Sequence, residues 1–399
     1  MVDIGRLRRL WWLAASVAAG LVGAWLVGLP AGAQDAGGAG EQEPPAFVTV
    51  ADGLDNPRGL AFGPDGTLYV AEAGKGGGGP CVPGDGEGPD SQDVCYGSSG
   101  AITRIKDGAA WRMSGAYPSL AGGDGSFATG LHDVSVDEAG IIHAVVGLGM
   151  HPGERLILAA EQPRVWVLGG LIEVDPETGA WEVVTDLANV EWFLNPGGGE
   201  VNSNPSSVVA AGDGRRVIVD AGGNSLLEAR ALGSVQTLAV FQDRADLQPP
   251  SAPGQDVPAI PPVHSVPTSV AMGPDGAYYV GEQTGLPGAA RVYRVVQGEA
   301  PEVFAEGFTN VVDIAFDNEG RLLVVDLAEE GLLAGEESAA EGELPEGALI
   351  RVNQDGSHEE IVSEGLIAPG GVAVGPDGAI YVTTCSVCAG GGEVVRIEE

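Results

Sequence analysis

Four acidic residues in this chain end similar stretches of sequence, each directly after a run of apolar residues. Three of them, Asp220, Glu282 and Asp326, are the predicted ligands of a divalent cation, and the fourth is Glu72. Carboxylates gathered with Asn side chains and carbonyl oxygens suit Ca²⁺ or Mg²⁺. An acid between a strand and a Gly-rich turn can instead accept hydrogen bonds from turn N–H groups, and the run 220–224 fits that alternative.

A second set of polar residues stands at or near the beginning of the same stretches. This set is predicted to bind a ligand together with the four acids: Arg58, His132, Asp133, Asn204, Thr268 and Asp313. Asn204 and Asp313 could complete the coordination of the cation. His132 beside Asp133 could act as a metal ligand or general base, or could simply be hydrogen-bonded at a strand start. No catalytic residue is assigned, because the nucleophile motif G-x-S-x-G is absent.

The four cysteines fall into two local pairs, Cys81 with Cys95 and Cys385 with Cys388. Four cysteines allow three pairings, and local disulfides are the prediction. Disulfides are expected of an exported protein, whereas a zinc site made by all four thiolates is the alternative.

These residues recur at fixed places because the chain repeats one hairpin of constant length six times. In each copy two apolar runs flank a turn, as at Pro64-Asp65-Gly66, where Pro presets φ and Gly accepts a positive φ. The flanking Leu, Phe, Tyr and Val residues suit a pleated, half-buried surface. The copies are 56–72, 130–146, 204–220, 266–282, 310–326 and 368–384.

Two more short runs follow each of the first five hairpins, so those copies have four predicted strands. The sixth copy has only three, and the stretch 47–50 (FVTV) is predicted to supply its fourth strand. That pairing closes a ring and removes the open edges of a linear array. The predicted fold is all-β, a six-bladed β-propeller spanning 46–399. A β-helix, the alternative, would need shorter and more uniform coils.

The N-terminal segment 1–33 is predicted to be a signal peptide, followed by a flexible linker over 34–45. Its basic region contains Arg6, Arg8 and Arg9, and a long apolar stretch then leads to an Ala-Gly-Ala cleavage site. A secreted or extracytoplasmic location follows from this pattern. The apolar stretch is long enough to span a bilayer, so an uncleaved anchor is the alternative.

The formal net charge is −37. A surface this acidic repels phosphate backbones, which excludes nucleic acid as a partner. It tolerates cations or basic partners, or it only maintains solubility. The chain is expected to be a monomer.

The hairpins resemble NHL and SMP-30-type propeller repeats, and longer stretches resemble the ScyD/ScyE family of secreted propellers. Those stretches are GGEVNSNP (198–205), VIVDAGGNSLL (217–227), VPTSVAMGPDGAYYVGEQTG (266–285), ARVYRVV (290–296), GFTN (307–310) and the CVPG…VCYG loop. The resemblance covers essentially the whole chain after the signal peptide. It implies a six-bladed fold and an extracytoplasmic location, and it implies no defined reaction.

The resemblance to SMP-30-type lactonases implies a further possibility. Those enzymes hold one central divalent cation on Glu, Asn and Asp, and a metal-bound water hydrolyses the lactone. Arg58, His132 and Thr268 stand at the corresponding places here, which departs from that ligand set. A quinone-dependent sugar dehydrogenase would need a basic pocket, which Arg58 and His132 alone do not make.

The expected function is therefore that of a secreted ligand-binding or scaffold propeller. Its partner is an unknown small molecule or protein at the channel face, and a divalent cation such as Ca²⁺ is expected at the channel mouth. The alternative is a metal-dependent hydrolase of the SMP-30/gluconolactonase type. Contact with a membrane is expected only through an uncleaved N-terminal segment.

Overall fold

The computed structural model describes residues 46–84, 92–230, 233–244, 265–328, 331, 344–353 and 356–398. All of them belong to one compact unit, Pro44–Glu399. The predicted signal peptide and linker, 1–33 and 34–45, lie outside the described residues. Within the described ranges, no helix has the length and apolar character needed to cross a membrane.

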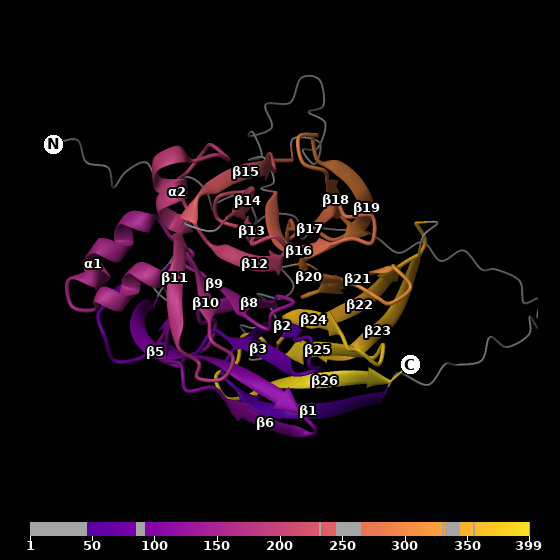
Figure 1. The fold of residues 1–399 in the computed structure, drawn as a ribbon, viewed down its shortest axis with the longest axis horizontal. Coiled ribbons are helices and arrows are strands. Elements are labelled where there is room, and N and C mark those ends of the chain that lie inside the picture. Colours follow the sequence, from indigo (N-terminus) through magenta and orange to yellow (C-terminus); the bar gives the residue numbers. More distant parts are fainter. Residues whose placement is uncertain are drawn as a thin grey trace, which may run out of the picture. The chain divides into compact units, whose positions relative to one another are not determined.

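The described strands form six antiparallel sheets arranged as the blades of a β-propeller, which confirms the predicted fold class (Figure 1). Blade 1 contains β2 (Pro57–Phe62), β3 (Leu68–Glu72), β5 (Asp93–Lys106) and β6 (Ala109–Arg112), with β4 (Cys81–Pro83) and β7 (Tyr117–Ala121) also paired to β5. Blade 2 contains β8 (Leu131–Val136), β9 (Ile142–Val146), β10 (Gly170–Val174) and β11 (Trp181–Asp186). Blade 3 contains β12 (Pro205–Ala210), β13 (Arg216–Asp220), β14 (Ser225–Ala229) and β15 (Val235–Val240).

The other three blades repeat the same order from the inside outwards. Blade 4 contains β16 (Val266–Met272), β17 (Tyr278–Gln283), β18 (Ala290–Val295) and β19 (Glu302–Phe308). Blade 5 contains β20 (Val311–Phe316), β21 (Leu322–Asp326), β22 (Glu346–Val352) and β23 (His358–Ile367). Blade 6 contains β24 (Gly371–Val374), β25 (Ile380–Thr384), β26 (Gly392–Glu398) and, as its outer strand, β1 (Ala46–Leu54).

Each repeated hairpin forms the two inner strands of one blade, joined by a tight turn. At the first turn the Asp65 carboxylate accepts hydrogen bonds from the Thr67 N–H and hydroxyl, at 3.0 and 2.9 Å. Gly66 adopts a φ of +76°, which glycine reaches without a steric penalty. The Pro-Asp-Gly signal therefore produces the hairpin by local chemistry alone.

The first strand of every blade faces the centre and contacts the first strand of the next blade. These contacts run from β2 through β8, β12, β16 and β20 to β24, and β24 contacts β2. At the junction between the chain ends, β1 pairs antiparallel with β26, with Phe47 opposite Ile397. Figure 1 shows the indigo and yellow strands of this junction side by side.

Apolar side chains fill the spaces between neighbouring blades. Tyr279 of blade 4 meets Phe316 of blade 5 edge-on, with ring centroids 4.9 Å apart. Phe62 of blade 1 meets Tyr381 of blade 6 in the same way, at 5.1 Å. Because strand side chains alternate between the two faces of a sheet, each blade can pack against both of its neighbours.

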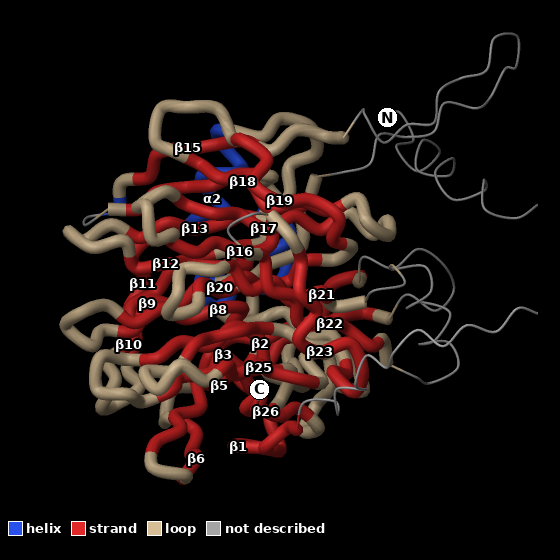
Figure 2. The backbone as a smooth tube through the Cα atoms, turned by 90° about the vertical axis from the view of Figure 1, so that its right-hand side faces the viewer, coloured by secondary structure: helices blue, strands red, loops and turns tan. Residues whose placement is uncertain are grey.

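Helices occur in the links of blade 2, where the sequence analysis predicted no element. They are the 3-10 helices η2 (Pro152–Glu154) and η3 (Pro163–Val167) and the α-helices α1 (Arg155–Ala159) and α2 (Leu187–Leu194). Asp186 caps α2 by accepting the Asn189 N–H at 3.0 Å, which explains where this helix begins. Figure 2 shows that strands, in red, make up most of the described chain.

Candidate functional site

The four acids that end the hairpins are buried, and each has partners close to its own blade. Glu72 has no exposed surface. Its carboxylate accepts the Asp55 N–H at 2.7 Å, the Thr103 hydroxyl at 2.6 Å and Nε of Arg112 at 2.9 Å. Glu72 therefore joins three strands of blade 1 to the segment that precedes its hairpin.

Asp220 does the same for blade 3. It accepts the Ser203 hydroxyl at 2.7 Å, the Asn204 N–H at 2.7 Å and the Gly223 N–H at 3.0 Å. Burial raises the pKa of its carboxyl above the ordinary aspartate value, although these hydrogen bonds oppose the shift. A buried carboxylate that receives three donors is a structural clamp between the chain segments on either side of the hairpin.

The remaining two acids are also engaged. Glu282 pairs with Arg244 at 2.9 Å and accepts the Tyr293 hydroxyl at 3.2 Å. Asp326 accepts the Thr309 N–H at 3.0 Å. Among the residues that the structure describes, no group of three or more His, Cys, Asp or Glu side chains could hold a metal ion. The structure does not bring Asp220, Glu282 and Asp326 together, so their placement lends no support to the predicted cation.

Three predicted ligand-binding residues near the hairpin starts reach backbone carbonyls outside their own hairpins. Arg58 donates to the Ala128 carbonyl at 3.1 Å, and Thr268 donates to the Val311 carbonyl at 2.6 Å. Nδ1 of His132 lies 3.2 Å from the Pro205 carbonyl. Burial and the nearby Arg58 lower the pKa of His132 to about 3, so its imidazole is neutral at pH 7 and a poor general base.

Asp133 and Asp313 occupy equivalent places in the inner strands of blades 2 and 5. Asp133 accepts the Ser207 hydroxyl and the Val208 N–H, both at 2.9 Å, so it bridges to the inner strand of blade 3. Asp313 accepts the Val372 N–H of blade 6 at 2.8 Å.

The two carboxyls are also linked electrostatically. Burial raises the pKa of Asp133 to about 7. Burial and the charge of Asp133 raise the pKa of Asp313 well above its ordinary value. The hairpin starts therefore contain two carboxyls that hold protons more tightly than exposed aspartates do.

These inner-strand bridges are a role that the sequence analysis missed. Ser207 extends the series, because its hydroxyl accepts the Val270 N–H of blade 4 at 3.1 Å. The equivalent place in blade 1 is Gly59, where an added Cβ would overlap the Asp133 carboxylate. The sequence does contain a signal for these bridges, because the polar residues Asp133, Ser207 and Asp313 stand at the same position of their hairpins. A polar residue at that position, however, does not reveal whether it binds a ligand or a neighbouring blade.

A cleft of about 840 Å³ opens among the links of blades 1 to 3 and the start of blade 4. This volume lies within the usual range for small-molecule sites, roughly 300–1,000 Å³. Of the residues predicted to bind a ligand, only Asn204 lines it. Asn204 Oδ1 accepts the Leu148 N–H at 3.2 Å, which ties the links of blades 2 and 3 together at the cleft wall.

The cleft has an apolar floor and a polar rim. Four buried side chains form the floor: Leu120, Leu148, Met150 and Phe241. Exposed side chains form the rim: Phe127, Glu200, Gln242 and Asp243. Thr129, Asn202, Asn204 and Asn224 also line the cleft, so it offers hydrogen-bonding groups beside the apolar ones.

Phe127 is the most unusual residue of the rim. Its side chain is 66% exposed, and its backbone has a φ of +52°, a region that bulky residues rarely adopt. Its N–H donates to the Val387 carbonyl at 3.1 Å, which fixes the segment against blade 6. An exposed aromatic held in a strained conformation contributes little to a core, so it is a candidate contact for a ligand.

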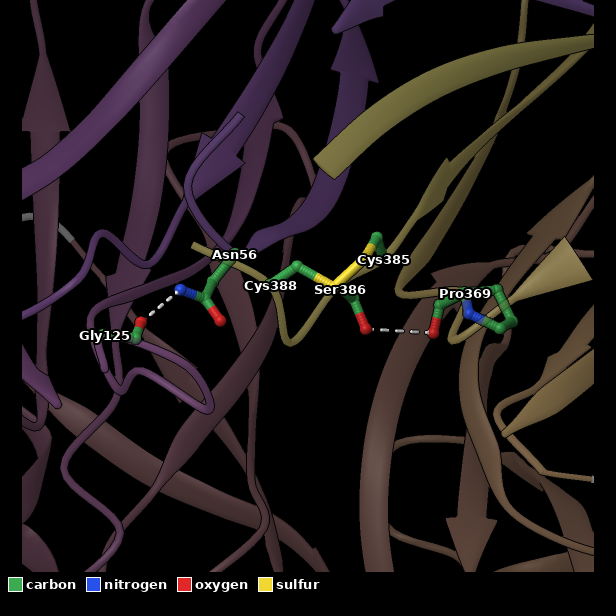
Figure 3. The surroundings of a disulfide bond; sticks show 6 residues. All are labelled: Asn56, Gly125, Pro369, Cys385, Ser386 and Cys388. Carbon is green, nitrogen blue, oxygen red and sulfur yellow. Dashed lines mark hydrogen bonds between the residues drawn. A yellow bond between two sulfur atoms is a disulfide. The ribbon is translucent and has the colours of Figure 1, made fainter. Parts of the chain in front are cut away.

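Val387 lies inside the Cys385–Cys388 disulfide turn. The structure contains both locally paired disulfides, Cys81–Cys95 and Cys385–Cys388. Figure 3 shows the second one beside Asn56, whose Nδ2 donates to the Gly125 carbonyl at 2.9 Å. The Asn56 N–H donates to the Cys388 carbonyl at 2.8 Å. This turn of blade 6 therefore positions both the start of blade 1 and the segment that carries Phe127.

The sequence analysis missed Phe127 and the other rim residues because they lie in links of unequal length, outside the repeated hairpins. It also missed Glu191 on α2, which is only 2% exposed. Glu191 and Asp220 both lie within 3.3 Å of the position that a Cβ on Gly223 would occupy. Burial and the charge of Asp220 raise the pKa of Glu191 to about 7. It stands behind the cleft wall without lining the cleft.

No known protein family matches the chain, and no curated protein matches its sequence. The structure is similar to a gluconolactonase of Xanthomonas campestris, with 12% sequence identity, a TM-score of 0.51 and coverage of 90% of this chain and 96% of that one. It is also similar to a calcium-binding protein, regucalcin, of Agrobacterium tumefaciens, with 16% identity, a TM-score of 0.51 and coverage of 89% and 94%. At such identities the likeness shows a shared fold alone, and the ScyD/ScyE resemblance stays a prediction.

Proposed function

We propose that this protein is an exported ligand-binding propeller. Its ligand occupies the cleft among the links of blades 1 to 3, between Phe127, Glu200 and Phe241. The observation that carries the proposal is the cleft itself, a space of about 840 Å³ with a buried apolar floor. The predicted channel residues are less suited to a ligand, because Glu72, Asp220 and Glu282 already receive hydrogen bonds or ion pairs from protein groups.

The competing function is that of a metal-dependent hydrolase of the SMP-30/gluconolactonase type. The similar structures from Xanthomonas and Agrobacterium favour it at the level of the fold. Arg58, His132 and Thr268 argue against it, because each of them is occupied with a backbone carbonyl. A binding function therefore accounts for more of the geometry than hydrolysis does.

Filling the cleft tests the proposal. Thr129 lines the cleft, and its backbone pairs in both directions with Leu120 at 2.7 and 2.8 Å, so Thr129→Trp directs an indole into a fixed place. Thr237→Trp, on the exposed outer strand of blade 3, is the matched control. In a ligand-observed NMR screen of small molecules, we expect to find compounds that bind the wild type and the control variant equally well. Their affinity for Thr129→Trp should be at least about tenfold lower, which corresponds to about 1.4 kcal/mol of binding free energy.

Two results would contradict the proposal. Equal binding of every hit to Thr129→Trp would place the site elsewhere. Turnover of a lactone panel by the wild type, lost on addition of EDTA, would replace the binding function with the hydrolase.

A further inference from the structure

We infer that the ligand of this cleft carries a positive charge on an apolar body. The inference rests on the proposed function and adds the chemical class of the ligand. It is drawn from a comparison of the buried, apolar residues of the cleft with its exposed residues, which include two carboxylates and an aromatic ring.

The most buried residues of the cleft are apolar, and Asn202, Asn204 and Asn224 line it beside them. Leu148 is fully buried, and Leu120, Phe241 and Met150 are 1%, 4% and 8% exposed. Phe241 is held by Tyr293, with ring centroids 5.3 Å apart. Removing an apolar body from water against such a surface is favourable. The floor therefore selects the body of the ligand by size and apolarity.

The rim supplies negative charge. Glu200 supplies a carboxylate there, Asp243 supplies a second one that also interacts with a protein group, and none of the described residues that line the cleft is Lys or Arg. Glu200 directly follows Gly198 and Gly199, whose φ values are +73° and +78°. The carbonyl of Gly199 accepts Nδ2 of Asn195 at 3.1 Å, which holds this loop at the end of α2. An anionic ligand would meet repulsion at this rim, and a cationic one would meet a partner.

Phe127 adds a second means of recognising a cation. Its exposed ring stands at the same rim and has no role in the buried core. The face of an aromatic ring attracts ammonium and guanidinium groups within about 6 Å of its centroid. Lys75 packs near Gly125 on this wall, and its ammonium group already pairs with Asp55 at 3.3 Å.

The charge of the whole molecule acts in the same direction. The formal net charge of the chain is −37, so the field of the molecule as a whole attracts cations. Such a field raises the local concentration and the association rate of cations and lowers those of anions. The cleft and the surface around it therefore favour the same sign of ligand.

Three matched probes test the inference by isothermal titration calorimetry on the full-length protein. They share a naphthyl body and differ in the attached group: naphthylmethylamine is a cation, naphthylmethanol is neutral and naphthylacetate is an anion. We expect affinity to fall in that order. Raising the salt from about 0.01 M to about 1 M shortens the Debye length from about 30 to about 3 Å, so it should weaken the cation, strengthen the anion and leave the alcohol least changed.

Two substitutions separate the charge from the body. Glu200→Gln should weaken the cation about three- to fivefold and leave the alcohol unchanged, as expected for an exposed ion pair. Phe127→Ala should weaken all three probes, and the cation most. The matched controls are Glu302→Gln and Phe304→Ala, which change two exposed residues of the outer strand β19. Both control variants should bind all three probes as tightly as the wild type does.

The outcomes distinguish the inference from the proposed function. Equal affinities for the amine and the alcohol, unaltered by Glu200→Gln but lowered by Phe127→Ala, would overturn the positive charge and keep the cleft as a binding site for neutral molecules. Tighter binding of the anion would overturn it as well. Probe binding that neither Phe127→Ala nor Thr129→Trp changes would overturn both statements.

Discussion

His132 and Asp133 are neighbours in sequence whose pKa values are shifted in opposite directions. The pKa of Asp133 is raised to about 7, chiefly by burial, so the folded state holds its proton more tightly than the unfolded chain does. Its contribution to stability is fully present below about pH 4 and is lost as the pH rises to about 7. The pKa of His132 is lowered to about 3, so its contribution is present above about pH 6.5 and is lost as the pH falls.

These opposed contributions make a prediction for single variants. In Asp133→Asn, the free energy of unfolding should rise with pH more steeply than in the wild type between about pH 4 and 7, by up to about 1.4 kcal/mol per pH unit. In His132→Gln the difference should have the opposite sign between about pH 4 and 6.5. Urea unfolding across this pH range measures both slopes. Parallel curves for wild type and Asp133→Asn would show that Asp133 titrates as an ordinary exposed aspartate.

At the scale of elements, the helical link of blade 2 depends on one buried cation. Arg155 has no exposed surface, and it donates to the carbonyls of Pro152 and Leu168 at 3.2 and 3.0 Å. It also pairs with Asp186 at 2.9 Å, and Asp186 is the residue that caps α2. One guanidinium thus holds together η2, the end of η3 and the start of α2 through five donors in a fixed geometry.

Arg155→Met should therefore destabilise this link. The substitution keeps an apolar stem but leaves two carbonyls and the Asp186 carboxylate without this donor, at a cost of about 3 kcal/mol. Hydrogen exchange should show the loss first in α2, while the strands of blades 4 to 6 keep their protection. Arg164→Met, an exposed arginine of η3, is the matched control and should unfold like the wild type. Equal stability of the two variants would mean that the helices are held by apolar packing instead.

For the whole molecule, the net charge of −37 opposes the compact packing of the six blades. Self-repulsion of like charges destabilises a compact state, and added salt screens it. The acids that end the hairpins do not add to the exposed charge, because Glu72, Asp220, Glu282 and Asp326 are all buried. Each of them instead fastens its own blade to the preceding link.

This arrangement predicts how the protein responds to metal ions. Saturating CaCl₂ should raise the melting temperature no more than NaCl at the same ionic strength, and EDTA should leave it unchanged, because the buried acids already have protein donors. Differential scanning calorimetry measures both effects. A calcium-specific rise that disappears in Asp220→Asn would instead support the predicted cation site.

The propeller could be predicted from the sequence because its signals are local. Each hairpin turn is set by neighbouring residues, such as Asp65 accepting the Thr67 N–H, and an aspartate accepts a turn N–H in five of the six described copies. The local pairing of Cys81 with Cys95 was also predicted from their closeness in sequence, and in the structure β4 and β5 place the two residues directly opposite each other. Neither inference needed any knowledge of how the blades pack.

The partners of the polar residues could not be predicted in this way. Asp133 lies far from Val208 in sequence and meets its N–H only because two blades pack side by side. The cleft has the same origin, because Phe127 depends on the Val387 carbonyl at the other end of the chain. Repetition along the sequence determined the blades, whereas long-range packing decided which acids became clamps and where a ligand could enter. The physical reason is that a turn depends on neighbouring residues, while a cleft depends on contacts that exist only after the ring has formed.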